Sequence, residues 1–204
     1  MSEHLRDLAA DVSKLLAGVE ARAGAFAARS GVACRSGCGE CCRNPDIECT
    51  VLELLPAAFA LVDEGRGSEL QTLLSESPPQ DGCLFLARTG QASDGRQLGR
   101  CTRYALRPSV CMLFGASVRV DGHGRRQAVT CRIMKDDDPV RVAAVDSFVQ
   151  DSPLDEIPLT SEASLALVGL NPSLGTQRLP IREALRMALE KVLLSTSYST
   201  EANA

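Results

Sequence analysis

The stretch Cys34-Arg35-Ser36-Gly37-Cys38-Gly39-Glu40-Cys41-Cys42 carries four thiols within nine residues. Packing alone does not need thiols at this density. The two glycines let the backbone fold tightly enough for several sulfurs to converge on one point. Soft thiolates suit zinc, iron–sulfur clusters and copper(I). We therefore interpret the stretch as part of a metal site that organises the middle of the chain.

Five further cysteines follow the stretch, which gives nine in 204 residues. Because nine is odd, a fully paired disulfide framework within the chain is impossible. We predict that Cys49 is the odd one out, because it lies at the edge of an apolar helix start and fits a core position. The predicted metal ligands are the other eight: Cys34, Cys38, Cys41, Cys42, Cys83, Cys101, Cys111 and Cys131.

The adjacent pair Cys41-Cys42 bears on the number of metals. Neighbouring side chains point in different directions in a helix or a strand. We therefore expect the pair to serve two metals, or one thiol to ligate while the other supports it. Eight thiols allow two four-coordinate sites, a thiolate-bridged pair of metals, or one cluster with additional sulfurs around it. The expected cofactor is zinc or iron, including an iron–sulfur cluster, because both metals take these ligands.

The amino-acid composition argues against several other classes of protein. Acidic side chains outnumber basic ones by 26 to 22, which argues against a general phosphate binder, and 3% aromatic residues provide no stacking platform for single-stranded nucleic acid. Charged residues spread through the first twenty positions leave no continuous apolar stretch for a signal peptide. No uncharged stretch of the sequence is long enough for a membrane span. We expect a cytoplasmic protein with metal ions as partners and no membrane contact; the sequence names no protein partner. Cytoplasmic thiols stay reduced, which favours metal binding over disulfides.

The charges divide the chain into three zones. Residues 83–134 hold nine arginines, no lysine and two acidic residues, a net charge of +7, whereas residues 1–82 and 135–204 carry −6 and −5. Cationic neighbours offset the charge of clustered thiolates and keep them deprotonated. We predict that Arg103 and Arg107 lie beside the cluster, near Cys101 and Cys111. An anion or nucleotide pocket is the alternative reading of the arginines.

The periodicity predicts an α+β fold that is mostly helical. An irregular cysteine-cluster core with two short β-hairpins is flanked by N- and C-terminal helices. Thr50 and Glu53 form a capping box at the start of one helix. The expected helices cover about 3–29, 51–63, 68–75, 139–150 and 161–169. A last helix is expected from 180, with a tail that frays from Ser195, and a short helical stretch is expected through Cys111. The expected hairpins pair 83–87 with 98–102 and 117–120 with 127–131. We divide the chain into an amphipathic helix (1–32), a metal-binding domain (33–134) and a helical segment packing on it (135–204).

Five separated elements occur in order over residues 33–132. They are the cysteine stretch with Gly39, Glu53, Cys83-Leu84-Phe85-Leu86, Gly99-Arg100-Cys101-Thr102-Arg103-Tyr104 and Arg107-Pro108-Ser109-Val110-Cys111. In these elements the chain resembles the YkgJ-type cysteine-cluster proteins, the CxxCxxCC family of zinc- or iron-chelating domains. The first gap departs from the pattern, being CxxxC rather than CxxC. The resemblance implies metal chelation and no established reaction.

The same resemblance supplies an enzyme alternative, because the family is related to flagellin lysine N-methylase. The spacing of Cys34, Cys38 and Cys41 also matches that of radical-SAM enzymes, whose three thiolates leave one iron open. Against this, Cys42 follows at once, and the chain lacks both the strand–helix alternation of a barrel and a glycine-rich nucleotide loop. Metal binding is therefore the first hypothesis. An Fe–S- or SAM-dependent protein-modifying enzyme and a redox or electron-transfer protein are the alternatives.

No catalytic residue is predicted. We expect His4 and His123, the only histidines, to be exposed to solvent. Glu53 is expected to cap its helix, with metal ligation as the alternative. Tyr104 either shields the cluster or belongs to the core.

Overall fold

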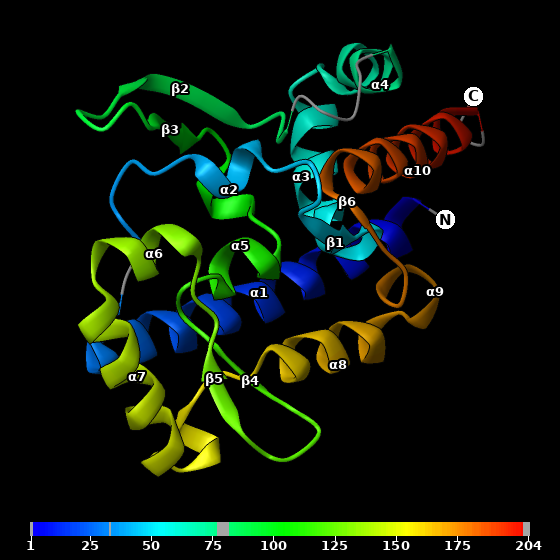
Figure 1. Ribbon diagram of the computed structural model, residues 1–204. Helices are drawn as coiled ribbons and strands as arrows, with labels where there is room; N and C mark the ends of the chain where they lie inside the picture. The colour runs from blue at the N-terminus through cyan, green and yellow to red at the C-terminus, as the bar shows by residue number, and fades with distance from the viewer. Residues whose placement is uncertain (1, 33, 77–81, 202–204) are drawn as a thin grey trace. The chain divides into compact units, whose positions relative to one another are not determined.

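A computed structural model describes residues 2–32, 34–76 and 82–201 (Figure 1). Within these ranges the chain is 62% helical, with ten α-helices and three short antiparallel strand pairs. The predicted α+β, mostly helical fold is confirmed. The chain divides into two compact units: unit 1 comprises Met1–Lys14, Gly37–Pro108 and Leu167–Ala204, and unit 2 comprises Leu15–Ser36 and Ser109–Ala166. The division into segments 1–32, 33–134 and 135–204 remains a prediction.

The first helix, α1 (Ser2–Ser30), contributes its first part to unit 1 and the rest to unit 2. It has the bounds that the apolar spacing predicts to within one residue. Val12 and Phe26 of that apolar stripe are fully buried. Gly31 ends the helix in the left-handed conformation, with a φ of 67°, which glycine adopts at little cost.

Unit 1 is built on three helices, α3 (Val51–Asp63), α4 (Gly67–Glu76) and α10 (Ile181–Glu201). Figure 1 shows α3 and α4 beside α10, and both contact it. Buried leucines on the facing sides of α3 and α10, including Leu52, Leu55 and Leu189, form the core. The predicted fraying from Ser195 is wrong, because α10 continues to Glu201 and Ser195 is itself buried.

Two strand pairs belong to unit 1. The hairpin of β2 (Leu86–Gln91) and β3 (Gln97–Cys101) was predicted, but its first strand begins later than expected because Leu84 and Phe85 form a turn. The second pair, β1 (Glu48–Thr50) with β6 (Arg178–Pro180), was not predicted. It joins segments about 130 residues apart and leads directly into α3 and α10. Short helical turns complete the unit: α2 (Glu40–Arg43), η2 (Tyr104–Leu106) and α9 (Pro172–Gly175).

Unit 2 packs α1 with the hairpin of β4 (Val118–Val120) and β5 (Arg126–Ala128) and with α7 (Pro139–Asp151). Its core includes Phe26, Val118, Val145 and Ile157. This hairpin confirms the second predicted one. Its other elements are α5 (Ser109–Leu113), α6 (Arg132–Asp137), η3 (Leu154–Glu156) and most of α8 (Thr160–Leu170).

The acidic run before Pro139 divides between two helices. Asp138 caps α7 by accepting a hydrogen bond from the Arg141 backbone at 2.9 Å. Asp136 and Asp137 belong instead to α6, which the sequence did not predict. None of the helices in the described residues is long and apolar enough to cross a membrane.

Candidate metal centre

The eight predicted ligands are divided between the two units. Unit 1 contains Cys38, Cys41, Cys42, Cys83 and Cys101, together with Cys49. Unit 2 contains Cys34, Cys111 and Cys131. All nine cysteines are free thiols.

The cysteine stretch lies against the strand that ends in Cys101. Cys38 forms an isolated bridge with Leu98, and the Gly99 amide donates to the Gly37 carbonyl over 2.9 Å. A Cβ atom on Gly39 would lie 3.3 Å from the Cα atom of Gly99. Glycine at both positions therefore permits the close backbone approach that brings the stretch and β3 together.

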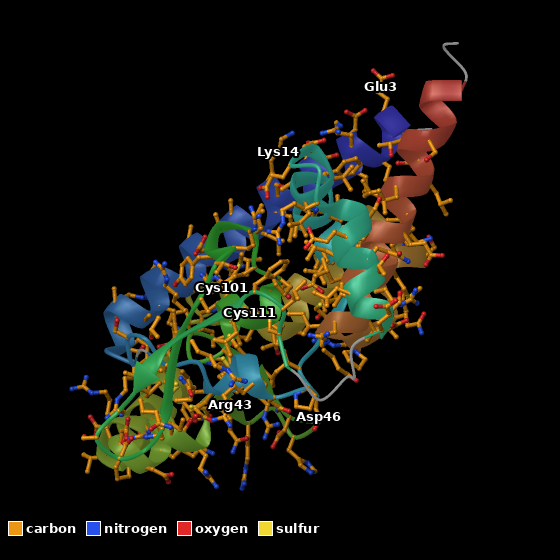
Figure 2. All side chains as sticks on the ribbon, turned by 90° about the horizontal axis from the view of Figure 1, so that it is seen from above. Glu3, Lys14, Arg43, Asp46, Cys101 and Cys111 are labelled. Atoms are coloured by element: carbon orange, nitrogen blue, oxygen red, sulfur yellow. The ribbon has the colours of Figure 1, made fainter. Side chains whose placement is uncertain are left out.

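The short helix α2 carries the adjacent pair. The Cys42 thiol hydrogen-bonds the Cys41 sulfur, and this bond is the main cause that lowers the pKa of Cys41 to about 6. Backbone N–H groups and the positive charge of Arg107 act in the same direction, against the effect of burial. The expectation that the pair serves two metals, or that one thiol ligates while the other supports it, stays a prediction. Arg43 and Asp46, which follow the pair, are exposed (Figure 2).

Cys83 enters the same neighbourhood from the segment before β2. Its backbone N–H donates to the Cys42 carbonyl oxygen over 2.7 Å. Burial raises the pKa of the Cys83 thiol to about 11, and the negative charges of Cys101 and Cys41 add to the rise. The Phe85 backbone and the Arg182 guanidinium oppose it. The backbone bonds of Cys83 to Cys42 and of Gly99 to Gly37 thus bring together the segments that carry Cys41, Cys42, Cys83 and Cys101. We call these four cysteines the unit 1 thiol group.

The two arginines predicted beside the cluster have different surroundings. Arg107 acts on Cys41, and it lies over the Tyr104 ring with its guanidinium carbon 3.4 Å from the ring centre. Arg103 instead forms a two-pronged ion pair with Glu64. Tyr104 is 60% exposed, so it is not a core residue.

Sequence analysis did not identify Arg182. This residue lies on α10, and its Nη1 atom donates to the Gly82 carbonyl over 3.2 Å. It lies outside the basic zone of residues 83–134 in which we sought cationic neighbours. Only the pairing of distant segments places it near Cys83, so no local sequence signal could have indicated it.

The residues given structural roles occupy the expected places. Cys49 is on β1 and has 0% exposure. The Glu53 carboxylate accepts hydrogen bonds from the Thr50 backbone at 2.8 Å and from the Thr50 hydroxyl at 2.9 Å, completing the predicted capping box. His4 and His123 are exposed.

In unit 2 the candidate ligands lie on separate elements. The Cys131 sulfur accepts a hydrogen bond from the Met134 backbone at 3.3 Å and so caps α6. Cys111 lies on α5, and Cys34 is exposed in the segment after α1.

Within the described ranges, no three cysteine, histidine, aspartate or glutamate side chains are arranged as a ready cage for one ion. The donor type nevertheless fits zinc or iron, because thiolates are preferred ligands of both. The low pKa of Cys41 favours the thiolate form that a metal requires.

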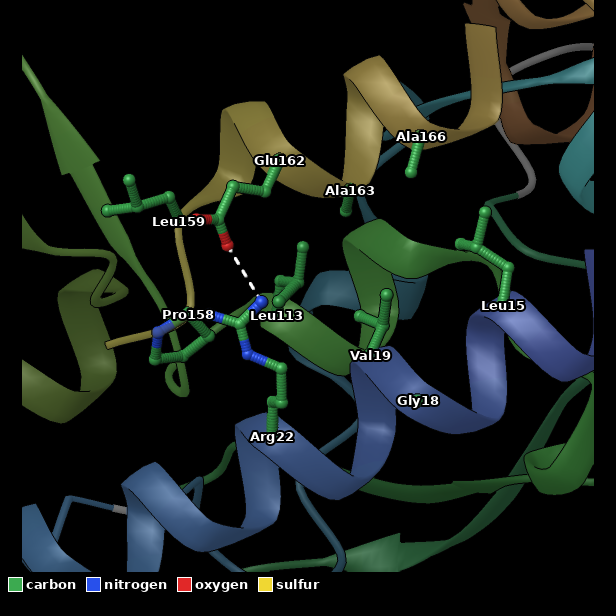
Figure 3. Close-up of a pocket in the computed structure, with 10 residues that line it drawn as sticks. All are labelled: Leu15, Gly18, Val19, Arg22, Leu113, Pro158, Leu159, Glu162, Ala163 and Ala166. Atoms are coloured by element: carbon green, nitrogen blue, oxygen red, sulfur yellow. Dashed lines mark ion pairs between the residues drawn. The ribbon is translucent and has the colours of Figure 1, made fainter. Parts of the chain in front are cut away.

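Each unit also has a pocket. In unit 1 a cavity of about 390 Å³ includes Leu84, Phe85 and Thr102, the residues that follow Cys83 and Cys101. In unit 2 a cavity of about 270 Å³ lies between α1 and α8, with apolar walls. Figure 3 shows Arg22 and Glu162 facing each other across this second pocket, where they form an ion pair of 2.9 Å.

Comparison with known proteins identifies the cysteine-bearing region. A family model, "CxxCxxCC: Putative zinc- or iron-chelating domain", matches residues 33–136. No curated protein and no solved structure matches the chain. The matched region is half of the chain and contains all eight predicted ligands. The chain belongs to the CxxCxxCC family of zinc- or iron-chelating domains.

Proposed function

We propose that the chain binds zinc or iron through cysteine thiolates and that the metal is at least partly structural. The unit 1 thiol group carries the proposal. Cys41 and Cys42, Cys83, and Cys101 come from three separate segments, yet the Cys83 amide bonds the Cys42 carbonyl, and the charges of Cys41 and Cys101 act on Cys83. Packing alone does not require such a group, whereas a metal ion uses all its members. Cys38, Cys34, Cys111 and Cys131 complete the set of proposed donors.

The segments that carry these thiols contain little regular secondary structure. Cys83 lies in an irregular segment, and Cys101 ends a two-stranded hairpin, a structure that is marginal by itself. A bound ion supplies crosslinks between such segments, so metal binding contributes directly to folding. We further propose that residues 33–134 act as the metal-binding domain, which the C-terminal segment supports through α10. Reduced thiols of this kind favour a cytoplasmic location.

The deciding experiment is elemental analysis with a visible spectrum on protein purified without oxygen. If the metal is zinc, eight thiolates should hold about two zinc ions per chain, and the protein should be colourless. Brown protein with iron and sulfide would identify an iron–sulfur cluster instead. Protein with reduced thiols and neither metal, even after reconstitution with each, would overturn the proposal.

An enzyme is the second candidate, and one observation favours it. The cavity of about 390 Å³ in unit 1 is bordered by the residues that follow Cys83 and Cys101, and its size is in the range of small-molecule sites. We propose an Fe–S- or SAM-dependent modifier of proteins as this alternative. SAM binding by the iron-loaded protein, measured by calorimetry, would support it. A reversible colour change without SAM binding would favour electron transfer.

A further inference from the structure

We infer that Arg182 of α10 is a positioning residue for the metal centre, which holds the segment carrying Cys83 by the carbonyl directly before this cysteine and brings a positive charge to that segment. The inference rests on the proposed function. It extends the site beyond the matched region of residues 33–136, into the C-terminal helix.

Helix α10 contacts the segment that contains Gly82 and Cys83. Arg182 Nη1 donates to the Gly82 carbonyl over 3.2 Å, and the next residue, Cys83, donates its N–H to the Cys42 carbonyl over 2.7 Å. The segment is thus hydrogen-bonded on one side to α10 and on the other to the end of α2. Gly82 is buried between them with a φ of 72°. The backbone at Gly82 and Cys83 is therefore held from both sides.

The second step concerns charge. A thiolate that ligates a metal carries negative charge, and several thiolates on one ion leave an anionic centre. The Arg182 guanidinium hydrogen-bonds the carbonyl of Gly82, the residue directly before Cys83, so its charge lies close to this ligand. Arginine stays protonated under all working conditions. It therefore supplies a permanent positive charge near a proposed ligand, which is how residues outside the ligand set adjust a metal site.

The third step is the anchoring of Arg182 itself. The strand pair β1–β6 precedes α10, and the Ile181 N–H donates to the Ile47 carbonyl over 2.9 Å. The first turn of α10 is thereby fixed against the segment that follows α2. Arg182 projects from an anchored helix start, so its reach to Gly82 does not depend on a mobile helix end.

The chain contains a matched control. Arg178, four residues earlier, donates through Nη2 to the Glu48 carbonyl over 2.7 Å. Glu48 precedes Cys49 as Gly82 precedes Cys83, so each arginine holds the carbonyl directly before a cysteine. Cys49 is the core cysteine outside the proposed ligand set. Removing the Arg178 side chain should therefore perturb a similar contact while leaving in place the backbone pairing of β1 with β6 that anchors α10.

The experiment compares full-length wild type, R182Q, R182K and R178Q. Zinc affinity is measured by competition with a chromophoric chelator, and exchange of the Cys83 amide is measured in the metal-free proteins. Loss of a residue that supports a metal ligand costs about 10–100-fold in affinity, which we expect for R182Q. R182K, which keeps a cation and a donor, should bind zinc more tightly than R182Q. R178Q should match wild type.

Amide exchange provides the metal-independent readout. R182Q should speed exchange at Cys83 by about tenfold or more, because the segment opens when it is released from α10. The inference is overturned if R182Q equals R178Q in zinc affinity, or if Cys83 exchanges at the wild-type rate in R182Q. If R182Q does not fold, the comparison of R182K with R178Q decides by the same two measurements. If the wild-type protein takes up no metal, the proposed function itself is overturned. If wild type and R182Q bind zinc equally well, only the role of Arg182 is overturned.

Discussion

The backbone N–H of Cys83 donates to the carbonyl oxygen of Cys42 over 2.7 Å. This bond joins the segment before β2 to the end of α2, and so brings two parts of the unit 1 thiol group together. Gly82 makes the approach possible. Its φ is 72°, and a Cβ atom there would lie 2.6 Å from the same Cys42 oxygen.

Gly82→Ala should therefore destabilise unit 1 and reduce metal content. The alanine would suffer both the unfavourable φ and the clash, so we expect a loss of about 2–3 kcal/mol in the free energy of unfolding, measured with urea. Gly65→Ala is the control. Its φ is 75°, but a Cβ atom would meet nothing within 4 Å, so about 1 kcal/mol should be lost and metal retained. Equal losses of stability and metal in both variants would contradict the role of the close contact.

Cys41 and Cys83 should react with alkylating agents in different pH ranges in the metal-free protein. Hydrogen bonding lowers the pKa of Cys41 to about 6, and burial raises that of Cys83 to about 11. Since the thiolate is the nucleophile, iodoacetamide should modify Cys41 increasingly as the pH rises through 6. Cys83 should stay slow until the solution is strongly alkaline. Peptide mass spectrometry measures both rates, and the chain unfolded in urea, where the profiles should coincide, is the control.

Cys101→Ser and Cys111→Ser should lower metal content, whereas Cys49→Ala should not. Serine lacks the thiolate that a soft metal needs. Cys49 is fully buried on β1, so its truncation should cost about 1 kcal/mol of stability through lost packing. Elemental analysis and urea unfolding of the three variants separate the two effects. Equal metal loss in all three would show that Cys49 was wrongly left out of the ligand set.

The sequence correctly predicted the elements that depend on interactions between neighbouring residues. Helix α3 has the predicted bounds because Thr50 and Glu53 form a capping box within four residues of sequence. The hairpin of β2 and β3 was found for a similar reason, although its start was misplaced by the turn at Leu84 and Phe85. The density of thiols likewise identified the candidate ligands.

The missed features depend on distant segments. Strands β1 and β6 have three residues each, too few for an alternating pattern, and about 130 residues separate them. Because this pair anchors α10, the contact between Arg182 and Gly82 was equally hidden. Helix α2 was missed because its four residues are too few to show a helical periodicity.

Glu53 allows a test that separates helix capping from metal ligation. The residue is only 1% exposed, and its carboxylate accepts two hydrogen bonds from Thr50. Glutamine keeps an acceptor at this position of a capping box, whereas alanine removes it. We therefore expect Glu53→Ala to lower the free energy of unfolding by about 2 kcal/mol and Glu53→Gln by less than about 1 kcal/mol. Metal content per folded chain should be unchanged in both, because the capping role does not involve the ion. Loss of metal from the glutamine variant at nearly wild-type stability would instead place Glu53 among the ligands.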